Sequence, residues 1–309
     1  MNINELPQEI LYNILLKLDY TYLITNCSLV NRNWKNFIKG YDLPIHYCRE
    51  FIEGYPQITT RNSTEIEFCK TVLTTTQNGI HIPLKAISAS STDHLSQHVA
   101  FTIAEFFLTF WSSKGSISEN DDELIVYEIG SGVAVLKFLK ITFFKANWLP
   151  EINGRKPCFA SKSIRIEINN EKGDKLYVSP IFDVIKSNNP QLFYLPKPFF
   201  VNEGYKIKLH LLGKLEKQLT DNKFYTCVHN FEIFGISNFI FPFQFKNGIF
   251  MKYSDEEFKL IKHNISYAKN ILYKLADYIS RFPNSTENPR ILFYLEQLGQ
   301  LNSVISVIE

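Results

Sequence analysis

Near its start the chain reads Leu6-Pro7-Gln8-Glu9-Ile10-Leu11-Tyr12-Asn13-Ile14-Leu15-Leu16-Lys17-Leu18. Pro7 suits the first turn of a helix, where its missing N–H would be unsatisfied in any case. Apolar residues then recur at steps of three and four and form one wide apolar face. The pattern therefore predicts an amphipathic helix that begins near Pro7.

The next residues continue in the same style. Asp19-Tyr20-Thr21 ends the first run and offers capping oxygens for a second helix that carries Leu23, Cys27 and Val30. A third helix is expected over residues 31–39, with Trp34, Phe37 and Ile38 on its apolar side. Three short helices of about forty residues rarely bury so much apolar surface among themselves. The surplus must pack on the rest of the chain or on a partner.

The whole N-terminal pattern resembles an F-box. The resemblance rests on the Leu-Pro start, Glu9, the apolar spacing and the segment Val30-Asn31-Arg32-Asn33-Trp34. It implies that residues around 3 to 44 bind the Skp-type adaptor of cullin–RING ubiquitin ligases. The implied apolar anchors are Leu6, Pro7, Ile10, Leu11, Ile14, Leu15, Val30 and Trp34. Some of these must pack within the module itself, and a plain N-terminal helical cap would show the same periodicity.

Length, composition and charge limit the remaining possibilities. A chain of 309 residues has room for one large domain or two ordinary ones, and 45% hydrophobic residues suffice for a real core. The net charge of +2 comes from scattered lysines and arginines, so we expect no nucleic-acid partner. We expect no signal peptide and no membrane-spanning helix, because no basic start precedes an apolar run and no run reaches roughly eighteen apolar residues.

The five cysteines, Cys27, Cys48, Cys69, Cys158 and Cys227, are widely spread along the chain. An odd number without regular spacing fits reduced thiols better than a disulfide framework. This distribution predicts a cytoplasmic or nuclear protein.

After the first domain (1–45), a helical connector is expected over 46–79. Its helical pattern is interrupted at Gly54-Tyr55-Pro56, and the polar segment Thr74 to Gly79 marks its end. From about residue 80 the period changes to two. Ser163 to Ile168, Lys206 to Leu211 and Phe224 to Phe234 alternate between apolar and polar residues, as half-buried strands do. Strands at this spacing, divided by Gly, Pro and Asn turns, predict an antiparallel β-sandwich over 80–236.

The β region resembles the C-terminal domain of a plant-like group of F-box proteins and, more distantly, the galactose-binding-like (discoidin-type) jelly-roll. The segments that carry the resemblance are Ile87 to Asp93, Phe110 to Gly115, Tyr177 to Pro180, Leu195 to Pro198, Leu211 to Lys214 and Tyr225 to Val228. The expected fold is α+β and multidomain: a three-helix F-box, a helical connector, an antiparallel galactose-binding-like sandwich and a C-terminal helical pair.

Two loops of this sandwich are candidates for ligand binding. An aromatic face, hydroxyls and charged groups that rim a shallow pocket would suit a sugar or a peptide. The candidates are Ser90, Ser91, Asp93, Trp111, Ser112 and Lys114. The structural alternative is that Trp111 buries its indole under the sandwich while the serines bond nearby backbone.

Residues 237–309 are expected to form a C-terminal helical extension. Ser254-Asp255-Glu256-Glu257 has the form of a capping box, and two amphipathic stripes follow, separated by residues 283–289. The two helices would pack on the sandwich or on the connector, or would form a surface for a partner helix.

No constellation of residues predicts catalysis. His94, His98, Cys227 and His229 lack the third and fourth ligands that a metal site needs, and no phosphate loop or nucleophile elbow is present. We therefore expect no cofactor and no metal. The sequence favours a non-catalytic substrate receptor of a cullin–RING ligase that presents a protein target, glycosylated or not, on its sandwich. A lectin-like glycan reader and an adaptor-bound scaffold without a degradation target are the alternatives.

Overall fold

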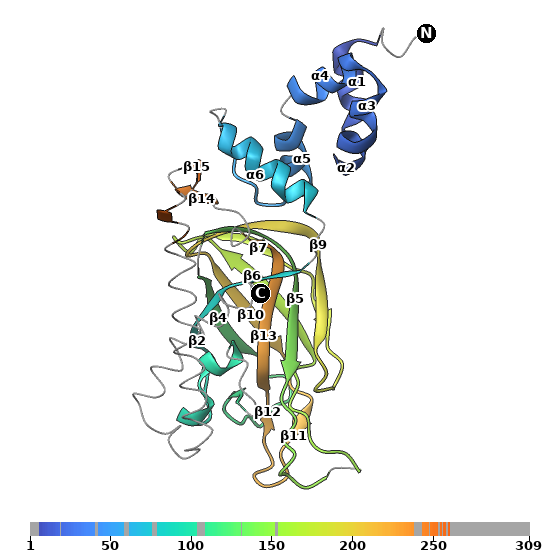
Figure 1. Ribbon diagram of the computed structural model, residues 1–309. Helices are drawn as coiled ribbons and strands as arrows, with labels where there is room; N and C mark the ends of the chain where they lie inside the picture. Colours follow the sequence, from blue (N-terminus) through green and yellow to red (C-terminus); the bar gives the residue numbers. More distant parts are fainter. Residues whose placement is uncertain are drawn as a thin grey trace.

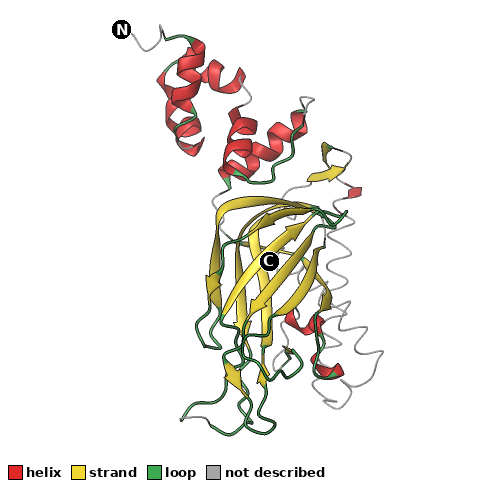
Figure 2. Cartoon of the chain, turned by 180° about the vertical axis from the view of Figure 1, so that it is seen from behind, coloured by secondary structure: helices red, strands yellow, loops and turns green. Residues whose placement is uncertain are grey.

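The computed structural model describes residues 6–18, 20–40, 43–58, 62–75, 79–103, 109–130, 132–151, 154–237, 243–246 and 248–252, together with residues 254, 256, 257 and 259. Helices lie at one end and a β-sandwich at the other (Figures 1 and 2). The expected C-terminal helical pair lies outside the described residues. Its capping box is confirmed, because the Ser254 N–H donates to Glu257 Oε2 and the Glu257 N–H donates to Ser254 Oγ.

The N-terminal helices are α1 (Gln8–Leu15), α2 (Tyr20–Tyr22), the π-helix η2 (Leu23–Cys27), α3 (Ser28–Val30) and α4 (Arg32–Gly40). The predicted second helix is thus one helical segment with a π-turn at its centre. Leu15 and Leu23 are fully buried, and Trp34 packs with them in a common core. No helix among the described residues has the length and apolarity needed to cross a bilayer.

The connector consists of α5 (Leu43–Phe51) and α6 (Ser63–Thr74). The expected boundary between residues 45 and 46 falls inside α5, because this helix serves two cores. Leu43 and Tyr47 pack into the core of the N-terminal helices, and Ile45 and Cys48 pack into the core shared with the sandwich. The Tyr47 hydroxyl lies 2.6 Å from the carbonyl oxygens of both Leu15 and Leu18.

The sandwich has two antiparallel layers among the described residues. One sheet has the order β1 (Ile80–Ile82), β13 (Cys227–Ser237), β5 (Val133–Phe143), β9 (Gln191–Asn202), with β3 (Trp111–Ser112) also paired to β13. The other has the order β2 (Leu84–Ala89), β4 (Glu123–Ile129), β10 (Lys206–Leu212), β6 (Ser163–Asn169), β7 (Lys175–Val178), with β8 (Phe182–Asp183) paired to β6. The predicted antiparallel β-sandwich is confirmed.

The alternating pattern sets the core between the two sheets. In β10 the inward side chains Ile207, Leu209 and Leu211 are fully buried, and the residues between them are half exposed. Ile207 lies opposite Tyr127 on β4 and Ile168 on β6. These neighbours belong to one continuous apolar cluster that contains residues from both sheets.

Strand β9 has no counterpart in the sequence prediction. Pro196 and Pro198 argue against a strand, because proline cannot donate to the ladder. The structure accommodates them at an edge, where the pairing of β5 and β9 shifts between Leu136 and Phe138. Only an edge strand with an irregularity tolerates such a segment.

Helices and sandwich are joined through β9. The Glu53 N–H donates to the Pro198 carbonyl and the Phe200 N–H donates to the Glu53 carbonyl, each over 2.8 Å. The rings of Tyr55, Phe68, Phe200 and Phe250 cluster beside this joint. Phe250 belongs to the hairpin β14 (Phe243–Lys246) and β15 (Ile249–Lys252), a β element within the region that was expected to be helical.

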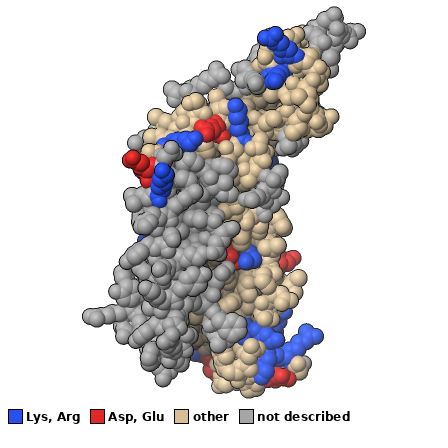
Figure 3. All heavy atoms as spheres, in the orientation of Figure 1, with Lys and Arg blue, Asp and Glu red and all other residues tan. Residues whose placement is uncertain are grey.

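On the face shown in Figure 3, charged side chains of both signs lie near one another at the helical end and at the opposite end of the sandwich. We call that opposite end, where the short strands β11 (Glu216–Lys217) and β12 (Phe224–Tyr225) lie, the distal end (Figure 1).

Candidate functional site

The N-terminal helices leave part of their apolar surface uncovered. In α1, Leu11 and Leu15 are buried, whereas Ile10 is 47% exposed and Ile14 is 41% exposed. Ile10 and Ile14 are four residues apart and so share a face of the helix. Pro7, just before α1, is exposed as well.

The structure therefore divides the eight predicted anchors into buried and exposed residues, which periodicity alone could not do. Leu11, Leu15 and Trp34 are buried in the module core, and Leu6 is half-buried. The exposed anchors are Pro7, Ile10, Ile14 and Val30. Tyr22, Ile24 and Leu29 are further exposed apolar residues of the same module that the sequence analysis did not single out. Exposed apolar side chains gathered on so small a module are typical of a protein-binding surface.

Residues 3–46 match the family model of the F-box domain. This module is an F-box. A further relative is an F-box protein from Arabidopsis thaliana, which is 22% identical over 291 residues, covering 76% of each chain. An F-box implies binding to a Skp-type adaptor, and F-box proteins are generally non-catalytic substrate adaptors.

Solved structures similar to this chain include carbohydrate-binding modules. A family 32 module from Clostridium perfringens, solved with galactose, is 15% identical, with a TM-score of 0.37 over 50% of this chain and 98% of that one. A chitosan-binding module from Paenibacillus is 14% identical, with a TM-score of 0.36 over 52% of this chain and 100% of that one.

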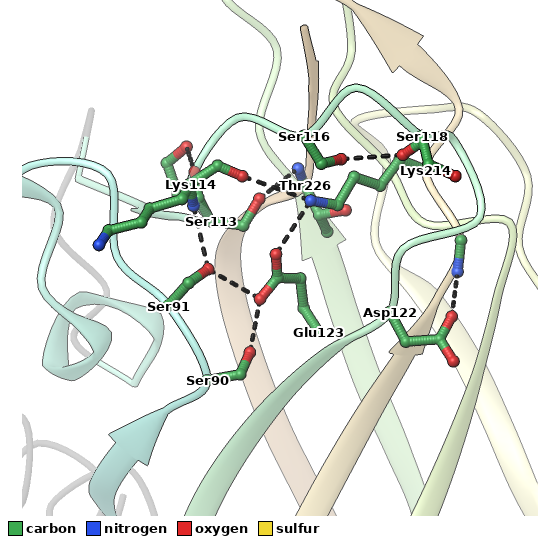
Figure 4. A network of polar contacts seen from close by, with 12 residues as sticks. Ser90, Ser91, Ser113, Lys114, Ser116, Ser118, Asp122, Glu123, Lys214 and Thr226 are labelled. Carbon is green, nitrogen blue, oxygen red and sulfur yellow. Dashed lines mark hydrogen bonds and ion pairs between the residues drawn. The ribbon is translucent and has the colours of Figure 1, made fainter.

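In the sandwich, Ser90 and Ser91 belong to a polar network (Figure 4). Their hydroxyls donate to Glu123 Oε2 over 2.5 and 2.8 Å. The other oxygen of Glu123 accepts a hydrogen bond from Lys214 Nζ over 2.9 Å, and both charged side chains are buried. The same ammonium donates to the Lys114 carbonyl, so this network holds two loops together.

Trp111 and Ser112 are also occupied by the fold. The Trp111 side chain is fully buried in the sandwich core, and its indole N–H donates to the Ser91 carbonyl. Ser112 Oγ accepts from the Cys227 thiol and donates to the Ser113 carbonyl. Because Trp111 has no exposed surface, its ring cannot serve as an accessible face for a ligand. At Trp111 the structure therefore shows the alternative in which the indole is buried under the sandwich.

Asp93 and Ser112 line a pocket of about 190 Å³ at the distal end. Residues that the sequence analysis did not connect complete it: Gln97, Phe110, Phe144, Trp148, Gln218 and Tyr225 are among the lining residues. Trp148 is 63% exposed, and its ring lies 5.3 Å from that of Phe144. The sequence signal for this pocket was the aromatic segment that follows β5. Its spacing resembles the continuation of a strand and therefore did not indicate a pocket.

Two groups in the pocket wall hold their protons strongly. Burial, followed by the nearby Asp93 carboxylate, raises the pKa of the Cys227 thiol to about 12. Burial also raises the pKa of Tyr225, whose hydroxyl donates to Asp221 over 2.5 Å. A neutral thiol is a poor nucleophile, so Cys227 is a structural residue here.

A larger groove of about 870 Å³ lies where the loops of the sandwich meet the β14–β15 hairpin. Its lining includes three glutamates and three lysines: Glu128, Glu171, Glu203, Lys172, Lys206 and Lys246. With equal numbers of acidic and basic residues, this lining favours neither an anionic nor a cationic ligand.

Across the described part of the chain, no three His, Cys, Asp or Glu side chains are placed to hold a metal ion. His94 and His98 instead accept hydrogen bonds from backbone N–H groups at the starts of two short 3₁₀ helices. His229 Nδ1 lies 2.6 Å from the Thr109 carbonyl oxygen.

Proposed function

We propose that this protein is a non-catalytic substrate receptor of a cullin–RING ubiquitin ligase. The F-box binds the Skp-type adaptor, the adaptor links the chain to a cullin, and the sandwich presents a target protein. Such a receptor works by proximity, because holding a target lysine near a charged conjugating enzyme raises its effective concentration.

The main support for the proposal is the exposed apolar surface of the F-box. The F-box match at residues 3–46 coincides with a module whose exposed surface includes Ile10, Ile14 and Val30. Burial of one such side chain at an interface contributes about 1.5–3 kcal/mol. The connector supports the same role, since α5 contributes side chains to both the F-box core and the core at the sandwich.

The test is co-purification of the full-length chain with a Skp-type adaptor and a cullin. An Ile10→Ala/Ile14→Ala variant should bind the adaptor roughly 100-fold more weakly, because two interface side chains lose most of their buried surface. The matched control is Ile117→Ala, since Ile117 is a 90% exposed isoleucine in a loop of the sandwich. Leu6→Ala/Pro7→Ala should also lose binding, which tests the predicted start of the anchor set.

Unchanged adaptor affinity in both double variants would contradict the proposal. Adaptor binding without assembly onto a cullin would favour the adaptor-bound scaffold without a degradation target. The proposed location is the cytoplasm or the nucleus, in keeping with five cysteines that are all free and buried.

A further inference from the structure

The pocket at the distal end has the size of a single side chain. Its volume is about 190 Å³. Sites that enclose a whole drug-sized molecule measure roughly 300–1,000 Å³. The pocket therefore suits one side chain or one small headgroup better than a chain of sugar units.

Aromatic rings form much of its wall. Phe110, Phe144 and Trp148 form one group, in which the ring centroids of Phe110 and Phe144 lie 3.8 Å apart. Phe159 and Tyr225 form a second group, with centroids 6.2 Å apart. The faces of aromatic rings attract cations that approach within about 6 Å of the ring centre.

Three hydrogen-bonding groups of the wall already donate elsewhere. The protons of Ser112 and Tyr225 go to the Ser113 carbonyl and to Asp221, and Gln218 Nε2 donates to Thr220. By contrast, Gln97 Oε1 is buried and has no hydrogen-bond partner among the described residues. An unsatisfied buried acceptor is costly, so a ligand that donates a hydrogen bond would relieve it.

Among the described residues, Asp93 is the only carboxylate that lines the pocket, and it is unpaired. Asp93 is exposed, and none of the described residues forms a hydrogen bond or ion pair with its side chain. Lys156 lies nearby but outside the lining, where its ammonium donates to the Leu149 carbonyl. A free carboxylate, an orphan acceptor and aromatic faces together disfavour an anion and favour a cation that carries N–H donors.

We propose that this pocket binds the positively charged side chain of a lysine or arginine in a polypeptide. The stem of the side chain would pass Trp148 at the pocket mouth, and the charged end would meet Asp93 and Gln97 Oε1. That the polypeptide is a ligase target rests on the proposed function, whereas the preference for a cation rests on the pocket alone.

The test is a titration of the full-length protein with the tripeptide acetyl-Gly-Lys-Gly-amide, followed by tryptophan fluorescence. Trp34 and Trp111 are buried, so a saturable change reports on the exposed Trp148. The matched probe is the same peptide with its lysine acetylated, which removes the charge and keeps the stem. We expect saturation at millimolar concentration, binding of the acetylated peptide at least about fivefold weaker, and weaker binding as salt is raised.

The decisive variant is Asp93→Asn, which removes the charge at nearly constant shape and should weaken the lysine peptide roughly fivefold. Asp121→Asn is its control, because Asp121 is an exposed loop aspartate that does not line the pocket. Thermal unfolding of both variants checks that each one is folded.

Several results would overturn the proposal. One is equal affinity for the two peptides, and another is unchanged affinity in Asp93→Asn. A third is the lack of a saturable signal up to about 50 mM peptide, a concentration at which weak binding of this kind is measurable. A fourth is saturation by galactose or chitotriose in place of the peptide. Adaptor co-purification is measured on the same wild-type preparation. Its failure would count against the proposed ligase role and leave the peptide result unaffected.

Discussion

At the scale of single residues, the buried pair Lys214 and Glu123 shows how the loops of the sandwich are held. Lys214 is 1% exposed, and its ammonium contacts both Glu123 and the Lys114 carbonyl. A buried charge is tolerated only with such partners, because the low dielectric of the interior penalises an isolated ion.

Lys214→Met should therefore destabilise the protein by about 3–5 kcal/mol, since it leaves the Glu123 carboxylate buried without its counter-ion. Urea unfolding measures this change. Lys252→Met is the matched control, because Lys252 and its partner Glu67 are both largely exposed and 3.0 Å apart. A loss for Lys214→Met no larger than that of the control would contradict this account.

A second residue-scale feature is Glu167 on β6. Burial alone would raise its pKa, but hydrogen bonds from Lys208 and Lys175 and their charges lower the pKa from its ordinary 4.5 to about 2. Lys208 lies directly across on β10, with its Nζ 2.8 Å from Glu167 Oε1.

Because the pKa of Glu167 is lower in the folded state, its contribution to stability is present above pH 4.5 and is lost as the pH falls toward 2. The contribution at neutral pH is on the order of 3 kcal/mol. Glu167→Gln should be less stable than wild type at pH 7 and nearly equal to it at pH 2, by urea unfolding. Glu119→Gln, at an exposed ion pair with Lys162, is the control, because exposed ion pairs contribute little to stability.

At the scale of elements, α5 links the F-box to the rest of the chain. The two carbonyls that Tyr47 contacts, Leu15 and Leu18, lie at the end of α1 and just beyond it. Carbonyls at a helix end lack intrahelical partners, so a donor from the next element orients the helix. The exposed face of α1 is thereby set relative to the connector.

At the scale of the whole molecule, the joint between the connector and the sandwich depends on Gly54. This residue has φ +68°, and a Cβ added to it would lie 2.5 Å from Cζ of Phe199. The Phe199 ring is fully buried in the sandwich core and has little room to move.

Gly54→Ala should lower the free energy of unfolding by about 2–4 kcal/mol, the sum of a left-handed backbone and an overpacked core. Gly154→Ala is the matched control, because Gly154 has φ +73° and nothing within 4 Å of its added Cβ. Thermal and urea unfolding of the pair isolates the clash from the backbone strain. An equal loss of unfolding free energy in the two variants would show that the Phe199 ring moves aside without cost.

The short-range sequence pattern was enough to predict those elements whose buried residues recur at a regular spacing. The spacing of Ile10 to Leu18 predicted α1, and strict alternation predicted β6 and β10. Strand β9 could not be predicted, because its prolines are tolerated only at an edge whose position depends on the pairing of β5 and β9. The β14–β15 hairpin was likewise assigned to a helical region, because its burial depends on α6 rather than on its own sequence.

The sequence by itself determined that a set of amphipathic helices precedes a sandwich, because helical and strand periodicities are local properties of the side chains. Only the tertiary structure decided which F-box anchors are exposed, since Leu11 and Ile10 belong to the same apolar stripe. It also brought Asp93 and Trp148, from two separate loops, into one pocket with Tyr225 of strand β12. Contacts of that kind arise from long-range strand pairing, on which local periodicity carries no information.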